Sequence, residues 1–206
     1  MQKNVVRKTI ALLFFLTVSV NAQTDVGTWA VYKNQLSLSE SVRFDTQYQH
    51  RSFNLDLAQD QHLITVGLST SLRSGLFLGA GYRRLETNTF LENGMYQKAA
   101  IGAAFGNLKI NNSFMLEERR IDDDFQMRYR FGTTASYPLN PKITLSIGNE
   151  VFLANAQGSF NQNRFTAQIT QEIGKNMRLH TGVMHWQFSN IKRWVLLCTF
   201  THSLRI

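Results

Sequence analysis

Residues 36–51 read LSLSESVRFDTQYQHR, and they alternate between apolar and polar side chains. The even positions include Leu36, Val42, Phe44 and Tyr48, whereas the odd positions carry only serine, arginine, aspartate and glutamine. Successive side chains of a β-strand point to opposite faces, so this stretch predicts a long strand with one apolar and one polar face. Strands of soluble sheets usually have about 5–6 residues, so a strand of roughly 10 or more favours a transmembrane barrel.

The same alternation recurs along the whole chain. We expect strands at residues 36–51, 62–73, 76–86, 96–105, 108–120, 127–137, 143–153, 160–173, 177–187 and 192–206. They would form an all-β transmembrane antiparallel up-and-down β-barrel of about ten strands, with twelve still possible, since single-chain bacterial barrels favour even numbers. In this barrel Leu78, Phe114, Ile147 and Ile169 are expected to face lipid. A secreted soluble all-β domain is the alternative that the length of the strands disfavours.

The N-terminus predicts export from the cytoplasm. Three basic residues precede an apolar run at residues 10–18, which is too short to span a bilayer as a helix, and Val20-Asn21-Ala22 offers a cleavage site. An uncleaved anchor is the alternative. We therefore predict a protein of the cell outer membrane, secreted across the inner membrane by a cleaved signal peptide. The expected divisions are a signal peptide at 1–22, an N-terminal segment at 23–35 lying against or inside the barrel, and the outer-membrane β-barrel domain at 36–206.

The composition of the chain limits the classes of molecule that it is expected to contact. The 206 residues suit one folded domain, and their net charge is +8. Export makes nucleic acid an unsuitable partner for this charge, so we expect contact with outer-membrane lipid, including anionic headgroups, and with the barrel-assembly machinery. The only cysteine, Cys198, shares the apolar face of its strand with Trp194 and Phe200, which favours a small lipid-facing residue over a catalytic thiol.

Five short motifs carry a family resemblance. They are Leu116-Glu117-Glu118-Arg119, Arg128-Tyr129-Arg130, Asn149-Glu150-Val151-Phe152-Leu153, Phe160-Asn161-Gln162-Asn163-Arg164 and Gly182-Val183-Met184-His185. In their order and spacing the chain resembles the small outer-membrane barrels of Gram-negative bacteria that are grouped as domain of unknown function 2490. This resemblance covers nearly all of the chain after residue 26, and it implies a barrel in the outer membrane without an established activity. The terminal Ile206 departs from the aromatic residue on which such barrels usually end.

The motifs share charged residues on the polar face of their strands. They are Glu117, Arg119, Arg128, Arg130, Glu150 and Arg164. Counting back from the hairpins predicts Glu117 opposite Arg128, and Glu150 opposite both Arg130 and Arg164, at distances where opposite charges can pair. We expect Glu150 to bridge its two arginines. The six residues therefore predict a lumen ion network that is structural or, because arginine outnumbers glutamate, binds an anion.

The function predicted from these residues is structural or binding, with a charged and plugged lumen. One alternative is a narrow channel for anions or small solutes, and another is a lipid-modifying outer-membrane enzyme. His180 is the only histidine placed firmly on the inward face, and no carboxylate or serine is placed beside it, so we predict no catalytic residue. Asp122-Asp123-Asp124 resembles a solvated turn more than a calcium loop. We predict no cofactor and no metal site, and the sequence does not identify a ligand.

Overall fold

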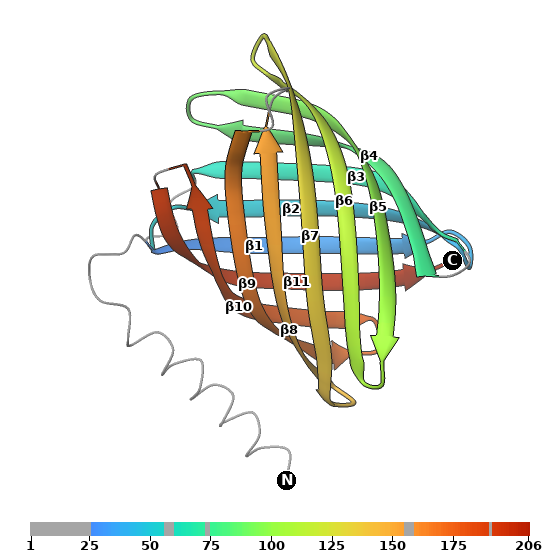
Figure 1. Cartoon of the computed structure of the whole chain (residues 1–206). Helices are drawn as coiled ribbons and strands as arrows, with labels where there is room; N and C mark the ends of the chain where they lie inside the picture. Colours follow the sequence, from blue (N-terminus) through green and yellow to red (C-terminus); the bar gives the residue numbers. More distant parts are fainter. Residues whose placement is uncertain (1–25, 56–59, 73–74, 155–158, 190) are drawn as a thin grey trace.

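The computed structural model describes residues 26–55, 60–72, 75–154, 159–189 and 191–206. The signal peptide predicted at 1–22 lies outside the described residues, as do residues 23–25. Within the described part the chain is entirely β-structure (Figure 1). The eleven strands are β1 (Val26–Ser37), β2 (Val42–Ser52), β3 (Gln61–Ser71), β4 (Leu76–Thr87), β5 (Leu91–Phe105), β6 (Leu108–Ile121), β7 (Asp124–Asn140), β8 (Ile143–Ala154), β9 (Ser159–Gly174), β10 (Met177–Phe188) and β11 (Ile191–Arg205).

The strands form one closed barrel in sequence order, and β1 pairs with β11 to complete it. All neighbours are antiparallel except β1 and β11, which run parallel in the register Val26↔Trp194 to Ser37↔Arg205. The prediction of ten strands was therefore one strand short, and the N-terminal segment expected at 23–35 contributes residues 26–35 to the barrel wall. The physical reason is that β2 and β11 would otherwise each present an unpaired edge, and β1 hydrogen-bonds to both.

Two kinds of connection separate the ends of the barrel. At the end that we call the short-turn end, the links cover residues 38–41, 72–75, 106–107, 141–142 and 175–176. At the other end, the long-link end, they cover 53–60, 88–90, 122–123, 155–158 and 189–190. Asp122 and Ser189 adopt positive φ angles in the two shortest links of the long-link end, and Gly75 and Gly106 do so at the short-turn end. Most strands are longer in the structure than the sequence predicted, so most links between them are shorter than expected.

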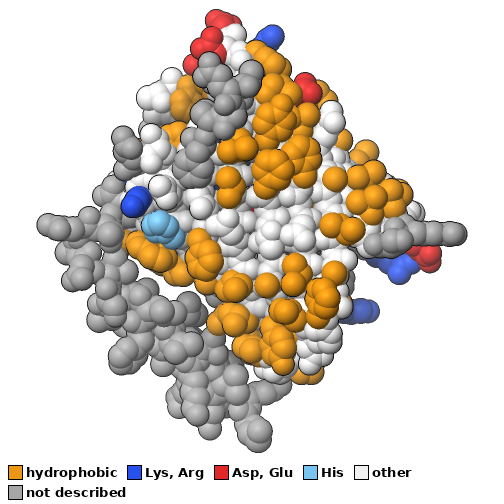
Figure 2. Space-filling view, in the orientation of Figure 1, with side chains coloured by type: hydrophobic (Ala, Val, Ile, Leu, Met, Phe, Trp, Pro, Cys, Tyr) orange, Lys and Arg blue, Asp and Glu red, His pale blue; other side chains and the backbone are white. Residues whose placement is uncertain are grey.

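The outer wall of the barrel is apolar. Hydrophobic side chains gather over the strands on the face seen in Figure 2. Leu78, Phe114 and Ile147 are exposed on this wall as predicted, and Ile169 pairs across the sheet with exposed Leu145. Exposed aromatic residues border it at both ends, with Tyr48, Tyr82 and Trp194 towards the long-link end and Phe105 and Tyr137 towards the short-turn end. The distribution is that of a wall with two aromatic girdles.

The inside of the barrel is polar. In β2 the residues Arg43, Asp45, Gln47 and Gln49 face the lumen, while Phe44 is exposed outside, so the alternation is confirmed over residues 42–51. The prediction of one strand over 36–51 was wrong at its start, because residues 36–37 end β1 and residues 38–41 turn into β2. The largest fully buried side chains include Glu92 and Glu117 together with Phe152. In the described part of the chain, no helix has the length and apolar character needed to cross a membrane.

The outer wall generates the first prediction. Ile147 is 49% exposed, so replacing it with arginine places a charge against lipid. Near the bilayer midplane this costs about 2–4 kcal/mol, and Ile147→Arg should unfold at correspondingly lower urea in lipid vesicles. Asn107→Arg, in the turn between β5 and β6, is the matched control and should unfold like the parent protein. Equal stability of the two variants would show that this wall does not face hydrocarbon.

Candidate functional site

The candidate site is the lumen, because all six charged residues predicted from the sequence lie on its wall. Glu117, Arg119 and Arg128 are buried, and the other three are partly exposed inside the barrel. All six belong to four consecutive strands of the sheet, of which β6, β7 and β8 carry Glu117 with Arg119, Arg128 with Arg130, and Glu150. Arg164 follows on β9. The structure therefore brings the predicted residues together.

Glu117 is the centre of this charge network. Its Oε1 accepts from Arg83 Nη1 at 2.5 Å and from Arg130 Nη2 at 3.0 Å. Its Oε2 accepts from Arg128 Nε at 2.5 Å, and the backbone pairs Glu117 directly with Arg128 as predicted. With 1% of its surface exposed, Glu117 holds three guanidiniums in a nearly dry site. Charge-assisted bonds of this kind are among the strong ones in proteins.

A second buried carboxylate extends the network towards the long-link end. Glu92 lies near the start of β5, is fully buried, and forms ion pairs with Arg119 and with Arg83 Nη2, the latter at 3.3 Å. Arg83 and Arg119 are both paired across the sheet with Gly94, so they meet over a position without a side chain. A Cβ on Gly94 would lie 2.6 Å from the Glu118 carbonyl oxygen. Arg83, Glu92, Glu117, Arg119, Arg128, Arg130 and Glu150 together form what we call the ion cluster.

Glu150 has a smaller part than the sequence suggested. The prediction that it lies opposite Arg130 was wrong, since Arg130 pairs with Phe152 and Glu150 pairs with Gly132. The reason is that β7 continues through an irregularity at Pro138/Asn140 and turns two residues later than expected. Arg130 Nη1 still reaches Glu150 Oε1 at 3.6 Å. Glu150 is opposite Arg164 as predicted, but the Arg164 guanidinium packs on aromatic rings.

Aromatic rings also hold guanidiniums of the lumen, including some that no described carboxylate pairs with and Arg130, which carboxylates hold as well. Arg164 lies 5.0 Å from the ring centre of Trp29 and 4.6 Å from that of Phe152. Arg51 covers Trp29 at 4.1 Å, and Arg130 covers Phe152 at 4.7 Å. These five residues form an alternating stack of cations and rings, which we call the arginine–aromatic stack. Cation–π contacts of this kind are worth about 0.5–2 kcal/mol each, more when dry.

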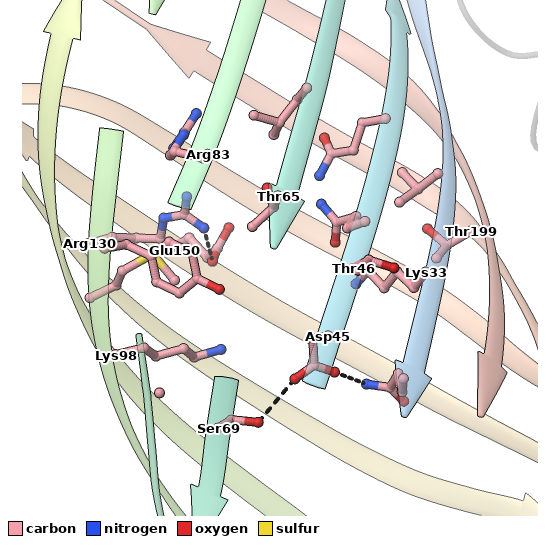
Figure 3. Close-up of a pocket in the computed structure, with 18 of the residues that line it drawn as sticks. Lys33, Asp45, Thr46, Thr65, Ser69, Arg83, Lys98, Arg130, Glu150 and Thr199 are labelled. Carbon is pink, nitrogen blue, oxygen red and sulfur yellow. Dashed lines mark hydrogen bonds and ion pairs between the residues drawn. The ribbon is translucent and has the colours of Figure 1, made fainter. Parts of the chain in front are cut away.

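A cavity of about 470 Å³ occupies the lumen beside the ion cluster (Figure 3). Among the described residues that line it, seven are basic and three are acidic. The basic ones are Lys33, Arg43, Arg51, Arg83, Lys98, Arg130 and Arg164, and the acidic ones are Asp45, Glu117 and Glu150. The wall of the cavity is therefore electropositive. Its remaining lining consists of eleven described residues with hydroxyl or amide groups, eight with apolar side chains, and Gly79.

Sequence reasoning left seven charged residues of the cavity wall and the ion cluster out of the predicted network. Two of them are Arg43 and Asp45, which lie on the polar face of the stretch at 36–51. Arg51, Arg83 and Lys98 lie on the polar face of their strands, so the alternation alone could have placed them in the predicted network. Glu92 was placed in a loop because β5 begins earlier than the alternation suggested. Lys33 was missed because residues 23–35 were not counted as a barrel strand.

The other predicted features remain separate from this site. His180 faces the lumen, where its Nδ1 lies 2.8 Å from Thr170 Oγ1 and its Nε2 lies 3.2 Å from Thr201 Oγ1. Cys198 is exposed on the outer wall, as predicted. Asp122 caps the link between β6 and β7, where its Oδ1 accepts from the Leu91 backbone N–H. The described residues contain no group of three His, Cys, Asp or Glu side chains placed to hold a metal ion.

Comparison with known proteins identifies a family and a fold. The family model described as "Protein of unknown function (DUF2490)" matches residues 26–196. The KdgM porin, solved in complex with disordered oligogalacturonate, is similar in structure with a TM-score of 0.51 and 11% identity, over 80% of this chain and 85% of the porin. A loop-deletion mutant of OmpT from Vibrio cholerae gives a TM-score of 0.46 and 13% identity, over 74% of this chain and 56% of OmpT. No curated relative matches the chain. The fold is that of an outer-membrane β-barrel.

The ion cluster generates the second prediction. Glu117→Gln removes the carboxylate that three arginines share, and breaking a buried ion pair from one side costs about 3–5 kcal/mol. The variant should therefore unfold at clearly lower urea in detergent or vesicles. Glu150→Gln should cost less, because Glu150 contacts one arginine at 3.6 Å and its side chain is 37% exposed.

The neighbouring Glu118 supplies the control for this measurement. It belongs to the same strand but lies on the opposite face from Glu117, so Glu118→Gln makes the same chemical change outside the lumen. The ion cluster is a stability element only if Glu117→Gln loses more stability than this control. Equal midpoints for the two variants would reject the assignment.

Proposed function

The chain belongs to the DUF2490 family, and we propose that it is an outer-membrane barrel that binds a small anion in its lumen and does not act as a general diffusion pore. The observation that carries this proposal is the excess of cations around the lumen cavity, seven basic residues against three acidic ones among those described. Clefts with one sign of charge and low-dielectric walls concentrate ions of the opposite sign.

The carboxylates of the cavity are already engaged. Glu117 pairs with three arginines, Asp45 pairs with Arg43 at 2.9 Å, and Glu150 faces Arg130. Among the described residues, neither Lys33 nor Lys98 has a carboxylate within ion-pair distance. The two lysines come from β1 and β5, four positions apart around the barrel, and Figure 3 places both at the cavity. An anion between these walls would meet charge that the protein itself does not neutralise.

The lumen is closed on one side of this cavity and accessible on the other. Towards the long-link end, Phe152, Glu92 and Glu117 are almost completely buried, and the two carboxylates pair with four arginines. Towards the short-turn end, the side chains of Arg43 and Asp45 are 36% and 30% exposed. A solute would therefore enter from the short-turn end.

Barrel size agrees with a closed lumen. About eight strands leave room only for side chains, and wide aqueous pores need about sixteen, so eleven strands suit a partly filled interior. In outer-membrane barrels the short turns lie in the periplasm, so this orientation would open the site to periplasmic solutes. We also retain the barrel-assembly machinery as the partner that inserts the chain, and the cleaved signal peptide as its route.

The closed lumen and its charge generate the third prediction. In planar bilayers the full-length mature barrel should give no large stable current steps, because the ion cluster fills its long-link half. In detergent, inorganic phosphate should bind to it, and Lys98→Gln should weaken phosphate binding about tenfold, the loss of one charged hydrogen bond.

Lys175→Gln provides the matched control, since Lys175 lies in the turn between β9 and β10 and away from the cavity. It removes the same charge but should leave phosphate binding unchanged. Equal weakening by the two variants would mean that net charge alone attracts phosphate. Large stable currents would contradict the closed lumen, and small anion-selective currents would favour the narrow channel.

A further inference from the structure

We infer that the lumen site takes a polyhydroxylated anion, a sugar-like solute that carries a carboxylate or phosphate group. This inference rests on the proposed function, because it names the ligand class of the same cavity. It comes from the uncharged polar groups of the cavity wall, which the charge argument does not use. Many of them have no hydrogen-bond partner among the residues that the structure describes.

One row of such groups crosses three neighbouring strands. Lys33 on β1 is paired across the sheet with Gln47 on β2, and Gln47 is paired with Thr65 on β3. All three line the cavity, and none of the three side chains makes a hydrogen bond or ion pair with another described residue. The row therefore presents an ammonium, an amide and a hydroxyl side by side. It can donate to a carboxylate at one end and exchange hydrogen bonds with hydroxyl groups at the other.

A second set lies on β9 and β11. Thr166 and Gln168 are two residues apart on β9, and Thr199 lies on β11 next to the β1 strand that carries Lys33. Figure 3 shows Thr199 close to Lys33. These three side chains also line the cavity without a hydrogen bond to any other described residue. Two hydroxyls and an amide thus continue the polar wall beyond the first row.

Glycines leave space between these groups and the opposite wall. Tyr96 on β5 lies flat across Gly67 and Gly81, where an added Cβ would come within 2.2 Å and 2.6 Å of the Tyr96 hydroxyl oxygen. The tyrosine ring therefore stays against the wall, and Lys98 on the same strand reaches the cavity. A volume of about 470 Å³ lies within the 300–1,000 Å³ usual for small-molecule sites.

This lining discriminates between classes of anion. An inorganic ion is small, so it can contact the cationic groups and only a few of the amides and hydroxyls, and it leaves the others to water. An apolar anion would lose water from these groups without replacing their hydrogen bonds, which costs free energy. A polyhydroxylated anion can satisfy both kinds of group at once. Specificity for hydroxyl groups is strong where the site itself is built to hydrogen-bond them.

The experiment is a calorimetric titration of the full-length mature barrel in detergent with four probes. Glucuronate carries both hydroxyls and a carboxylate, glucose lacks the charge, acetate lacks the hydroxyls, and glucose 6-phosphate replaces the carboxylate with a phosphate. We expect glucuronate or glucose 6-phosphate to bind about tenfold or more tightly than glucose and acetate, since each class of contact contributes separately. The better of the two identifies the acidic group.

Two substitutions separate the charged part of the site from its hydroxyl-binding part. Lys98→Gln should weaken both acidic sugars about tenfold and leave glucose unchanged. Thr199→Val preserves side-chain shape but removes a hydroxyl, so it should weaken the acidic sugars severalfold and leave inorganic phosphate and acetate unchanged. Both variants must first show the heat-modifiable gel mobility of the folded parent barrel. Gln168→Leu repeats the second test on β9 if Thr199→Val fails to fold.

The outcomes distinguish this inference from the proposed function. Phosphate binding with no preference for glucuronate or glucose 6-phosphate over acetate would overturn the inference and leave the anion site standing. Binding of glucose as tight as that of both acidic sugars would also overturn it, because charge would then play no part. If neither phosphate nor any acidic probe binds, both proposals fail together, and the cavity holds only water.

Discussion

The backbone of this chain must satisfy its own hydrogen bonds, because hydrocarbon offers no partner for an N–H or C=O group. The pairing of β1 with β11 meets this requirement by closing the barrel, and the closed barrel encloses the lumen. An odd number of strands leaves first and last running the same way, so the closing pair is parallel. Its register places Trp29 opposite Leu197 on one side and opposite Arg51 on the other. The same strand thus completes the wall, supplies the ring between two guanidiniums and brings Lys33 to the cavity.

A narrow closed barrel creates a second problem, which is what to place inside it. The inward face carries more arginine than glutamate, and a buried charge is costly unless it is paired. This chain uses two solutions side by side. Glu92 and Glu117 neutralise the guanidiniums nearest to them, and Phe152 and Trp29 accept others on their ring faces. Arginine suits both roles because its planar group can pair with a carboxylate and stack on an aromatic ring.

Alternation predicted ten of the eleven strands, with shifted bounds, and it predicted their faces and the direct pair of Glu117 and Arg128. These features depend only on period and hairpin position. It could not predict what closes the barrel. Residues 26–35 alternate as a strand, but the expectation of an even number placed them outside the wall. Alternation also could not predict that Glu117, and not Glu150, is the central carboxylate of the lumen. The register of β7 and β8 depends on an irregularity at Pro138/Asn140, and a shift of two residues changes the partner of Arg130 without changing its face.

The same inward face builds both the closed half and the cavity, because side-chain size changes along the strands. β4, β6 and β8 all run from the short-turn end towards the long-link end. On β4 the inward residues after Phe77 pass from Gly79 and Gly81 to Arg83, and on β8 they pass from Gly148 through Glu150 to Phe152. Small residues leave the lumen hollow on one side, and large charged or aromatic residues fill it on the other. The asymmetry of the lumen therefore follows from the order of inward residues along single strands.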